Sequence, residues 1–406
     1  MKFSTIRFNR YYVFLTLSFF LISASVVLSG CGGGSSSSSG TSINTYVAGT
    51  YCLGNAIDSS GNIWVANAGN GTPGTAVGDS NVTELSPSGT VIGTYAAGTF
   101  PVGMAIDKSG NVWIENYGDG KAGSAPGDSN VTELSPSGAL IGTYVAGIYP
   151  AGGIAIDKSG NVWVTNWGSV SGTAGTPGTA VDDSNVTEFS PTGAVIGTFV
   201  AGSSPGGIAI DSAGNIWVAN KGDGTAGKGL TNSNITELSS TGQFIATYVA
   251  GSRPEGIAVD PSGNIWVVNK GNGIVGTAPG DSNVTELSPS GTVIGTYAAG
   301  TYPEIVAIDS AGNVWVANGY NRITGSVPSG SSITELNPFG AVINTFATGN
   351  QPYGIAIDKS GNVWVTNFGN GIAGTSQNDS NVQEYVGAAK GQQYFPYSGP
   401  QWPGAE

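Results

Sequence analysis

Two identical segments of the chain, AIDKSGNVWVTN at 155–166 and again at 356–367, bring together side chains that could do chemistry. Each segment holds an aspartate, a lysine, a serine and a tryptophan in close order. A carboxylate beside an amine can transfer protons, so a duplicated active site is one explanation. A recurring structural unit is the other, and the rest of the sequence separates the two.

Catalytic and metal-binding patterns are missing from the sequence. The chain of 406 residues contains no histidine, so a Ser-His-Asp or Cys-His set cannot form. It has no G-x-x-x-x-G-K-[ST] phosphate loop, and the glycine-rich segments 69–71 and 118–120 do not lie between a strand and a helix. Calcium prefers several carboxylates in one short loop, whereas 118–128 holds two, far apart. We therefore expect no catalytic residue, no metal and no cofactor.

Composition limits the fold class and the partners. The chain has 67 glycines but only 10 % charged residues, which favours many short strands joined by turns. Its formal net charge is −13 and its isoelectric point is about 4.3. Such an acidic chain repels phosphate backbones, so we expect no nucleic-acid partner.

The aspartate of the opening segment belongs to an ID-x-x-G-N-x-W motif that recurs, with small variations, at spacings of 49 to 54 residues. The seven aspartates are Asp58, Asp107, Asp157, Asp211, Asp260, Asp309 and Asp358. The seven tryptophans are Trp64, Trp113, Trp163, Trp217, Trp266, Trp315 and Trp364. A V-T-E-L segment or a variant follows in each copy and supplies Glu84, Glu133, Glu188, Glu237, Glu286, Glu335 and Glu384.

Each repeat reads as four strands, with the patterns G-I-A-I-D, N-V-W-V-T-N, S-N-V-T-E-L and T-V-I-G-T-Y. Short turns join the first strand to the second and the third to the fourth, and a long glycine-rich loop joins the second to the third. Four-stranded units of 40 to 50 residues are typical of propeller blades. The sequence therefore predicts an all-β, seven-bladed β-propeller over residues 42–386.

The two ends of the repeat region predict that the ring closes. The last repeat stops after its third strand, at 382–386. The segment SINTYVAG at 42–49 resembles the fourth strand IGTYVAG at 141–147 but has no blade of its own. An N-terminal strand that completes the last blade explains both ends and removes the exposed edges of the alternative, a solenoid.

In this fold the opening segment is a strand, a turn and a strand. We expect Asp157 to bond the turn backbone, Gly160 to need a positive φ and Trp163 to fill the space between blades. The glutamates of the third strands either line a site or bond neighbouring groups, and we favour the structural role.

P-x-G-I-A-I-D followed by G-N-V-W-V-T-N and V-T-E-L resembles the NHL-repeat propellers, and most of all the group that contains virginiamycin B lyase. The resemblance covers 42–386 and implies the fold, while propellers host many activities. In that group the chemistry is ascribed to histidines near the channel mouth, with a carboxylate and a magnesium ion. The present chain contains no histidine, and its second strands end in asparagine and not in a carboxylate residue. We therefore expect a non-catalytic protein, with a lyase or lactonase that has altered residues as the alternative.

The N-terminus predicts export and lipidation. Residues 1–30 combine a basic head with the apolar run 11–28, as in a secretory signal. The ending L-S-G-C resembles the bacterial lipobox, which implies a lipid on Cys31, and the following Gly32 implies sorting to the outer membrane. A plain membrane-spanning anchor is the alternative. We expect a monomeric lipoprotein of the cell envelope that contacts the membrane through its lipid.

Two further segments flank the propeller. Residues 31–41 read as a flexible Gly/Ser tether. Residues 387–406 form a tail rich in glycine, proline and aromatic residues.

The long loops and the links between repeats should share one face of the propeller, here called the long-loop face, and the short turns share the other, the short-turn face. Residues that break the repeat gather on the long-loop face, where departures tend to carry function, although drift on a tolerant surface is the alternative. The candidate ligand-binding residues are Glu115, Tyr117, Trp167, Arg253, Glu255, Lys270, Glu304 and Tyr353. Other departures on this face are Lys221, Tyr320, Arg322 and Phe368.

These candidates suggest a ligand. Trp167 and Tyr353 would stack on a sugar or an aromatic group, and Glu255 with Glu304 would hold a cationic group. We therefore expect a protein or glycan partner on the long-loop face.

Overall fold

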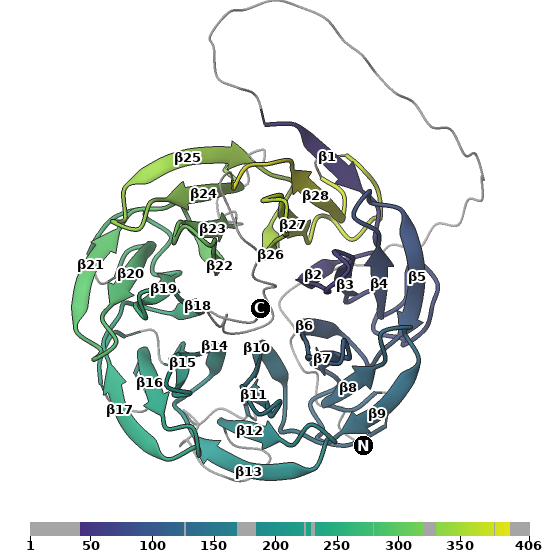
Figure 1. Ribbon diagram of the computed structural model, residues 1–406, viewed down its shortest axis with the longest axis horizontal. Helices are drawn as coiled ribbons and strands as arrows, with labels where there is room; N and C mark the ends of the chain where they lie inside the picture. Colours follow the sequence, from purple (N-terminus) through teal and green to yellow (C-terminus); the bar gives the residue numbers. More distant parts are fainter. Residues whose placement is uncertain are drawn as a thin grey trace, which may run out of the picture. The chain divides into compact units, whose positions relative to one another are not determined.

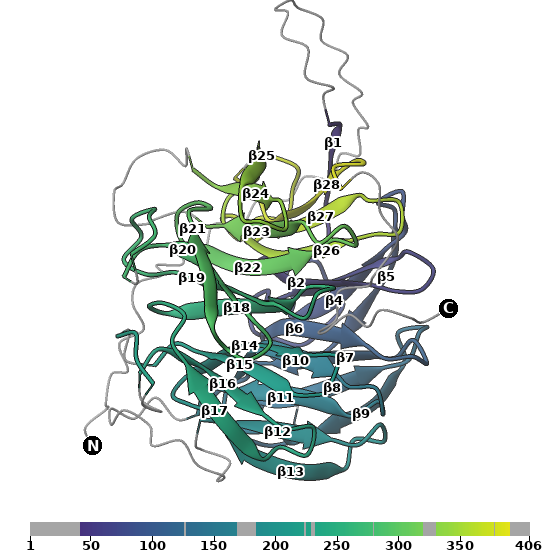
Figure 2. The ribbon, with the colours of Figure 1, turned by 60° about the vertical axis from the view of Figure 1, so that its left-hand side comes forward.

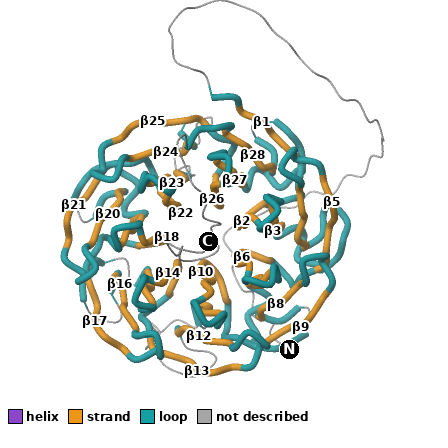
Figure 3. The backbone as a smooth tube through the Cα atoms, in the orientation of Figure 1, coloured by secondary structure: helices purple, strands orange, loops and turns teal. Residues whose placement is uncertain are grey.

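The computed structural model describes residues 41–389 except 126, 169–183, 223–224, 229–231, 279, 320–329 and 377. The chain divides into a unit of residues 1–40, which lies outside this description, and a unit of residues 41–406. Every element of the described residues is a strand (Figure 3), and none of them belongs to a helix long and apolar enough to cross a membrane. The expected signal peptide, Cys31 lipidation and most of the tail therefore lie outside the described residues.

The strands form seven four-stranded antiparallel sheets around a central channel, which confirms the predicted propeller (Figure 1). The first three blades contain β2 (Cys52–Ile57), β3 (Ile63–Asn67), β4 (Asn81–Leu85) and β5 (Val91–Ala96); β6 (Pro101–Ile106), β7 (Val112–Asn116), β8 (Asn130–Leu134) and β9 (Leu140–Tyr144); and β10 (Pro150–Ile156), β11 (Val162–Asn166), β12 (Asn185–Phe189) and β13 (Val195–Val200).

The next three blades contain β14 (Pro205–Ile210), β15 (Ile216–Asn220), β16 (Asn234–Leu238) and β17 (Phe244–Tyr248); β18 (Pro254–Val259), β19 (Ile265–Asn269), β20 (Asn283–Leu287) and β21 (Val293–Tyr297); and β22 (Pro303–Ile308), β23 (Val314–Asn318), β24 (Ser332–Leu336) and β25 (Val342–Ala347). In each blade the first strand lines the channel and the fourth forms the rim (Figure 1, Figure 2).

The seventh blade closes the ring with the two ends of the chain. It contains β26 (Pro352–Ile357), β27 (Val363–Asn367) and β28 (Asn381–Tyr385). Its fourth strand is β1 (Ile43–Tyr46), which pairs antiparallel with β28 and places Ile43 opposite Tyr385. The predicted closure is therefore confirmed.

The space between blades is the core of the molecule. The indole of Trp163 is fully buried and packs against Ile208, Ile210 and Val218 of the next blade. The other six tryptophans are at most 1 % exposed, as the repeat predicts. Burial of large side chains on both sides of each sheet stabilises the stack of blades.

The turn of the opening segment has the predicted structural role. Asp157 accepts hydrogen bonds from the backbone N–H groups of Ser159 and Asn161, at 2.8 and 2.9 Å. Its second oxygen accepts from the indole of Trp163 at 3.3 Å, so the turn is tied to the core. Gly160 has a φ of 87°, which a side chain would oppose.

The glutamates of the third strands are buried structural residues. Glu84 accepts from Asn62 and from the hydroxyl of Tyr95, each at 2.9 Å. Equivalent tyrosine hydroxyls bond Glu133, Glu237, Glu286 and Glu384 at 2.7 to 2.9 Å. Burial nevertheless raises the pKa of the Glu84 carboxyl.

The long loops pack by close approach of an aromatic ring to a glycine. Gly120 has a φ of 87°, and a Cβ built on it would lie 2.2 Å from the hydroxyl oxygen of Tyr149 in the next blade. Tyr149 itself has a φ of 55°, and the residue before the first strand is left-handed in every blade. The GNG and GDG segments are therefore packing sites between neighbouring blades.

Candidate functional site

The channel opens on the long-loop face at a site that we call the mouth. The pairing of Pro254 with Asn269 places the start of a first strand beside the end of the second strand of the same blade. Residues after that proline and after that asparagine therefore meet around the channel in every blade. The scaffold repeats here, but the side chains at these positions differ.

Four charged side chains form a row across the fourth, fifth and sixth blades, which we call the charge chain. Nζ of Lys221 lies 2.8 Å from Oε1 of Glu255, and Nζ of Lys270 lies 3.1 Å from the same oxygen. Nζ of Lys270 also lies 2.6 Å from Oε2 of Glu304. The four side chains are 11 to 25 % exposed, so solvent screens these contacts only in part.

The charges of the chain stabilise one another. Burial would raise the pKa of Glu255, but Lys221 and Lys270 outweigh burial and hold that pKa below its usual range. Burial would lower the pKa of Lys270, and the two glutamates outweigh it and raise that pKa. The cationic group expected between Glu255 and Glu304 is therefore present within the chain, as the Lys270 amine.

Aromatic side chains line the other part of the mouth. We call this group the aromatic cluster; it packs around Leu53 and Val102 and consists of Tyr51, Tyr117, Trp167, Tyr353 and Phe368. The ring centroids of Tyr51 and Phe368 are 4.7 Å apart, and Tyr117 meets Trp167 edge-on at 5.8 Å. The two parts of the mouth thus offer different chemistry.

Trp167 joins the two parts. Nζ of Lys221 lies 3.9 Å from the centroid of the Trp167 ring, a cation–π contact. The indole N–H of Trp167 is buried and has no hydrogen-bond partner among the described residues. Burial raises the pKa of the Tyr353 hydroxyl, and Glu255 and Glu304 raise it further. A ligand at the mouth would therefore contact both the aromatic cluster and the charge chain.

Two of the predicted candidates stand apart from these groups. Arg253 precedes β18 with a φ of 52°, and its backbone bonds Ser233 and Lys270. Within the described part of the chain no ion pair includes its guanidinium. Glu115 lies deeper, in the channel. Tyr320 and Arg322 fall outside the described residues.

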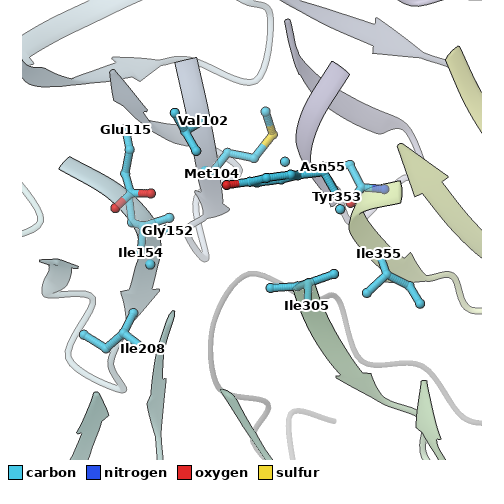
Figure 4. Close-up of a pocket in the computed structure, with 14 residues that line it drawn as sticks. Asn55, Val102, Met104, Glu115, Gly152, Ile154, Ile208, Ile305, Tyr353 and Ile355 are labelled. Carbon is cyan, nitrogen blue, oxygen red and sulfur yellow. The ribbon is translucent and has the colours of Figure 1, made fainter. Parts of the chain in front are cut away.

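Below the mouth the channel holds a partly open cavity (Figure 4). Its walls include Glu115, Tyr353, Met104 and Asn55, together with aliphatic side chains from several first strands. Glu115 is fully buried there, and burial raises its pKa to about 8. Nowhere in the described ranges do three metal-ligating side chains gather.

Sequence reasoning missed Asn55 and the irregular backbone of β10. The signal for Asn55 is its place in the repeat, because the other first strands have Ile, Met or Val there. The signal for β10 is one extra residue between Pro150 and Asp157, which gives Gly152 a φ of 108°. Both were visible as departures from the repeat.

Comparison with known proteins finds no family model and no curated protein that matches the chain. Solved structures do match. The chain resembles a streptogramin B lyase at 14 % identity and a TM-score of 0.60, over 84 % of this chain and 96 % of that one. It resembles the virginiamycin B lyase of Staphylococcus aureus at 14 % identity and a TM-score of 0.60, over 85 % and 99 %. It resembles the hydrazine synthase of Kuenenia stuttgartiensis at 14 % identity and a TM-score of 0.62, over 87 % and 100 %.

The strand order and these matches define the class of the molecule, a seven-bladed β-propeller of four-stranded blades. Within that class it has a propeller fold like that of virginiamycin B lyase, in agreement with the sequence resemblance. At this level of identity the likeness concerns the fold alone.

Proposed function

We propose that this chain is a non-catalytic lipoprotein of the cell envelope that binds a glycan at its mouth. The observation that supports the proposal is the convergence of departures from a sevenfold repeat. The charge chain and the aromatic cluster meet at one end of the channel, whereas the repeated aspartates, tryptophans and glutamates hold the scaffold.

The chemistry of the mouth suits a sugar. Sugar rings present apolar C–H faces that pack on aromatic rings, and their hydroxyls bond carboxylates and amines. Trp167 supplies a half-buried ring whose N–H has no partner among the described residues, and the ring contacts Lys221, which in turn pairs with Glu255. The charge chain is balanced in sign, so it favours a neutral ligand with many hydroxyls over a highly charged one.

The test is a thermal-shift screen of the full chain in mild detergent against neutral, amino-sugar and uronic-acid oligosaccharides. A ligand at 100 times its Kd should stabilise the protein by about 2.7 kcal/mol. Glu304→Gln and Trp167→Ala should remove the shift, whereas Lys108→Ala on the short-turn face should leave it intact. If Glu304→Gln retains the shift, the glycan does not bind at the mouth. A protein partner lost in the same variants would favour the protein alternative.

The envelope anchor is tested separately. Metabolic labelling with a radioactive fatty acid should mark the wild-type chain and not Cys31→Ser. The proposed outer-membrane site predicts that the labelled chain fractionates with outer-membrane markers. Recovery of Cys31→Ser in the same fraction with an intact apolar segment would favour a plain membrane-spanning anchor.

The enzyme alternative is addressed by direct assay. Glu115 is a buried carboxyl with a pKa of about 8, which is the kind of group that a general acid requires. Turnover of a streptogramin or a lactone by the purified protein, lost in Glu115→Gln, would replace our proposal with a lyase or lactonase.

A further inference from the structure

Three departures from the sevenfold repeat face the channel cavity. Glu115 occupies a second-strand position where the other blades have Ala, Thr or Val. Asn55 replaces an aliphatic residue in a first strand, and the extra residue in β10 brings the backbone of Gly152 to the wall. Because the other blades show what the scaffold needs, these changes are not required for folding a blade.

The carboxyl of Glu115 is buried, and the polar groups that oppose the effect of its burial are the backbone N–H groups of Gly153 and Gly152. Its side chain is 0 % exposed, and among the described residues neither Oε1 nor Oε2 accepts a hydrogen bond of standard geometry. The backbone makes room for it, because a Cβ on Gly103 would lie 2.3 Å from Oε2. A buried polar group without a partner costs free energy, so a group that bonds this carboxyl is expected.

The remaining wall indicates the chemistry of that group. Among the described residues Oδ1 of Asn55 is also buried without a hydrogen-bond partner, and like the two oxygens of the ionised Glu115 carboxylate it is an acceptor. Met104, Ile154 and Ile305 give the cavity an apolar surface (Figure 4). The wall thus offers acceptors and apolar area, and its complement is a donor attached to an apolar body.

Tyr353 extends into the same cavity from the opposite side. In Figure 4 its ring lies across the cavity with the hydroxyl directed toward the side of Glu115. An aromatic face near an acceptor favours an organic cation, because the ring attracts positive charge.

We propose that the channel cavity binds a small primary ammonium ion, with the Glu115 carboxylate as its counter-ion and Asn55 as a second acceptor. An ammonium group supplies three donors and one positive charge, and its carbon body contacts the aliphatic walls. This site shares Tyr353 with the glycan site at the mouth, but its two acceptors, Glu115 and Asn55, are not part of the charge chain or the aromatic cluster, and the proposal does not depend on glycan binding.

Binding is coupled to a proton. Burial raises the pKa of Glu115 to about 8, with the N–H groups of Gly153 and Gly152 acting in the opposite direction. Tyr353 faces the same cavity, and its pKa is raised first by burial and then by Glu255 and Glu304, with a smaller contribution from the Glu115 charge. At neutral pH the carboxyl is therefore protonated in the free protein, and the entering ammonium ion displaces that proton.

The experiment is calorimetric titration of the full chain in mild detergent with benzylammonium, and with benzyl alcohol as the neutral control. Benzylammonium should bind at least tenfold more tightly than benzyl alcohol. Its affinity should rise about tenfold per pH unit from pH 6 to pH 7.5, because the carboxyl must lose its proton. Glu115→Gln should lower the ammonium affinity at least tenfold and remove the pH dependence, while the alcohol binds as before.

Asn55→Ile restores the residue type of the other blades, so it should fold, and it should lower the ammonium affinity about threefold. The proposal would be overturned if benzyl alcohol bound as tightly as benzylammonium, or if benzylammonium did not bind at 10 mM. It would also be overturned if Glu115→Gln bound benzylammonium as tightly as the wild type, or if Mg²⁺ or Ca²⁺ bound tightly in place of the ammonium. Glycan binding that persists in Glu115→Gln leaves the mouth proposal standing.

Discussion

Replacing Phe199 by tyrosine tests the role of the buried glutamates. In five blades a tyrosine hydroxyl bonds the third-strand glutamate, but the third blade has Phe199 at this position. Glu188 therefore has one hydrogen-bond partner in the described part of the chain, Asn161 at 2.9 Å. Burial, followed by repulsion from Asp157, raises the pKa of Glu188 to about 7.

The ring of Phe199 lies as the tyrosine rings of the other blades do, so the position of the hydroxyl that Phe199→Tyr would add can be inferred. The ring of Phe199 stacks on Trp163 at 5.4 Å and 28°, and the ring of Tyr95 stacks on Trp64 at 5.4 Å and 24°. The Phe199→Tyr hydroxyl should therefore meet the free oxygen of Glu188, as that of Tyr95 meets Glu84.

A hydrogen bond to a charged group contributes about 1.5–3 kcal/mol, and one pKa unit corresponds to about 1.4 kcal/mol. We expect Phe199→Tyr to lower the pKa of Glu188 by about one unit and to stabilise the protein by about 1.5 kcal/mol at pH 8. The gain should be lost as the pH falls through the two folded pKa values, about 7 in the wild type and about one unit lower in the variant, because the folded glutamate is then neutral in both proteins. It should be below about 0.5 kcal/mol at pH 5.

Urea unfolding followed by tryptophan fluorescence at pH 8 and pH 5 measures this difference. Phe346→Tyr is the matched control, because Asn344 already donates to Glu335 at 2.7 Å in that blade. Equal gains in the two variants, or a gain in Phe199→Tyr that does not change with pH, would refute the assignment of the glutamates as hydrogen-bonded anions.

Three further predictions concern stability and use the same denaturation assay. The free energy of unfolding of Glu115→Gln should equal that of the wild type at pH 4.5 and exceed it by up to about 5 kcal/mol at pH 9. The reason is that burial raises the Glu115 pKa, so the wild type loses stability as the pH rises from the unfolded to the folded pKa. A difference that does not change with pH would contradict this. Lys270→Met should destabilise the protein by about 2–3 kcal/mol, because the carboxylates of Glu255 and Glu304 are then left with Lys221 alone. The control Lys108→Met should change the stability little. Gly120→Ala should cost about 1–3 kcal/mol, whereas Gly127→Ala, with nothing near its Cβ, should cost less than about 0.5 kcal/mol.

The fold could be predicted because its determinants are periodic. Asp157, Gly160 and Trp163 act within one turn and one blade interface, and each recurs in every repeat. The closure by 42–49 followed from counting strands. Such local and repeated contacts can be predicted without knowing the dimensions of the ring.

The contacts of the site were harder to predict. Residues of the mouth were found because they break the repeat, but their partners depend on distances across the ring. Glu255 and Glu304 were expected to hold an external cation, whereas Lys270 lies between them. The depth of Glu115 depends on the approach of Gly103 and on the irregular β10, which no local pattern specifies.

The closure of the ring has a mechanical consequence. Force applied to the chain at residue 41 would act first on β1, which holds the seventh blade through four pairs with β28. Asn44 and Tyr46 add side-chain bonds to Glu384 at 2.9 and 2.8 Å, so the same ladder that seals the propeller resists a pull from its N-terminal side. A pull on that end must therefore break these pairs before it can act on any other strand, so we expect the ring to open between the first and the last strand of the chain.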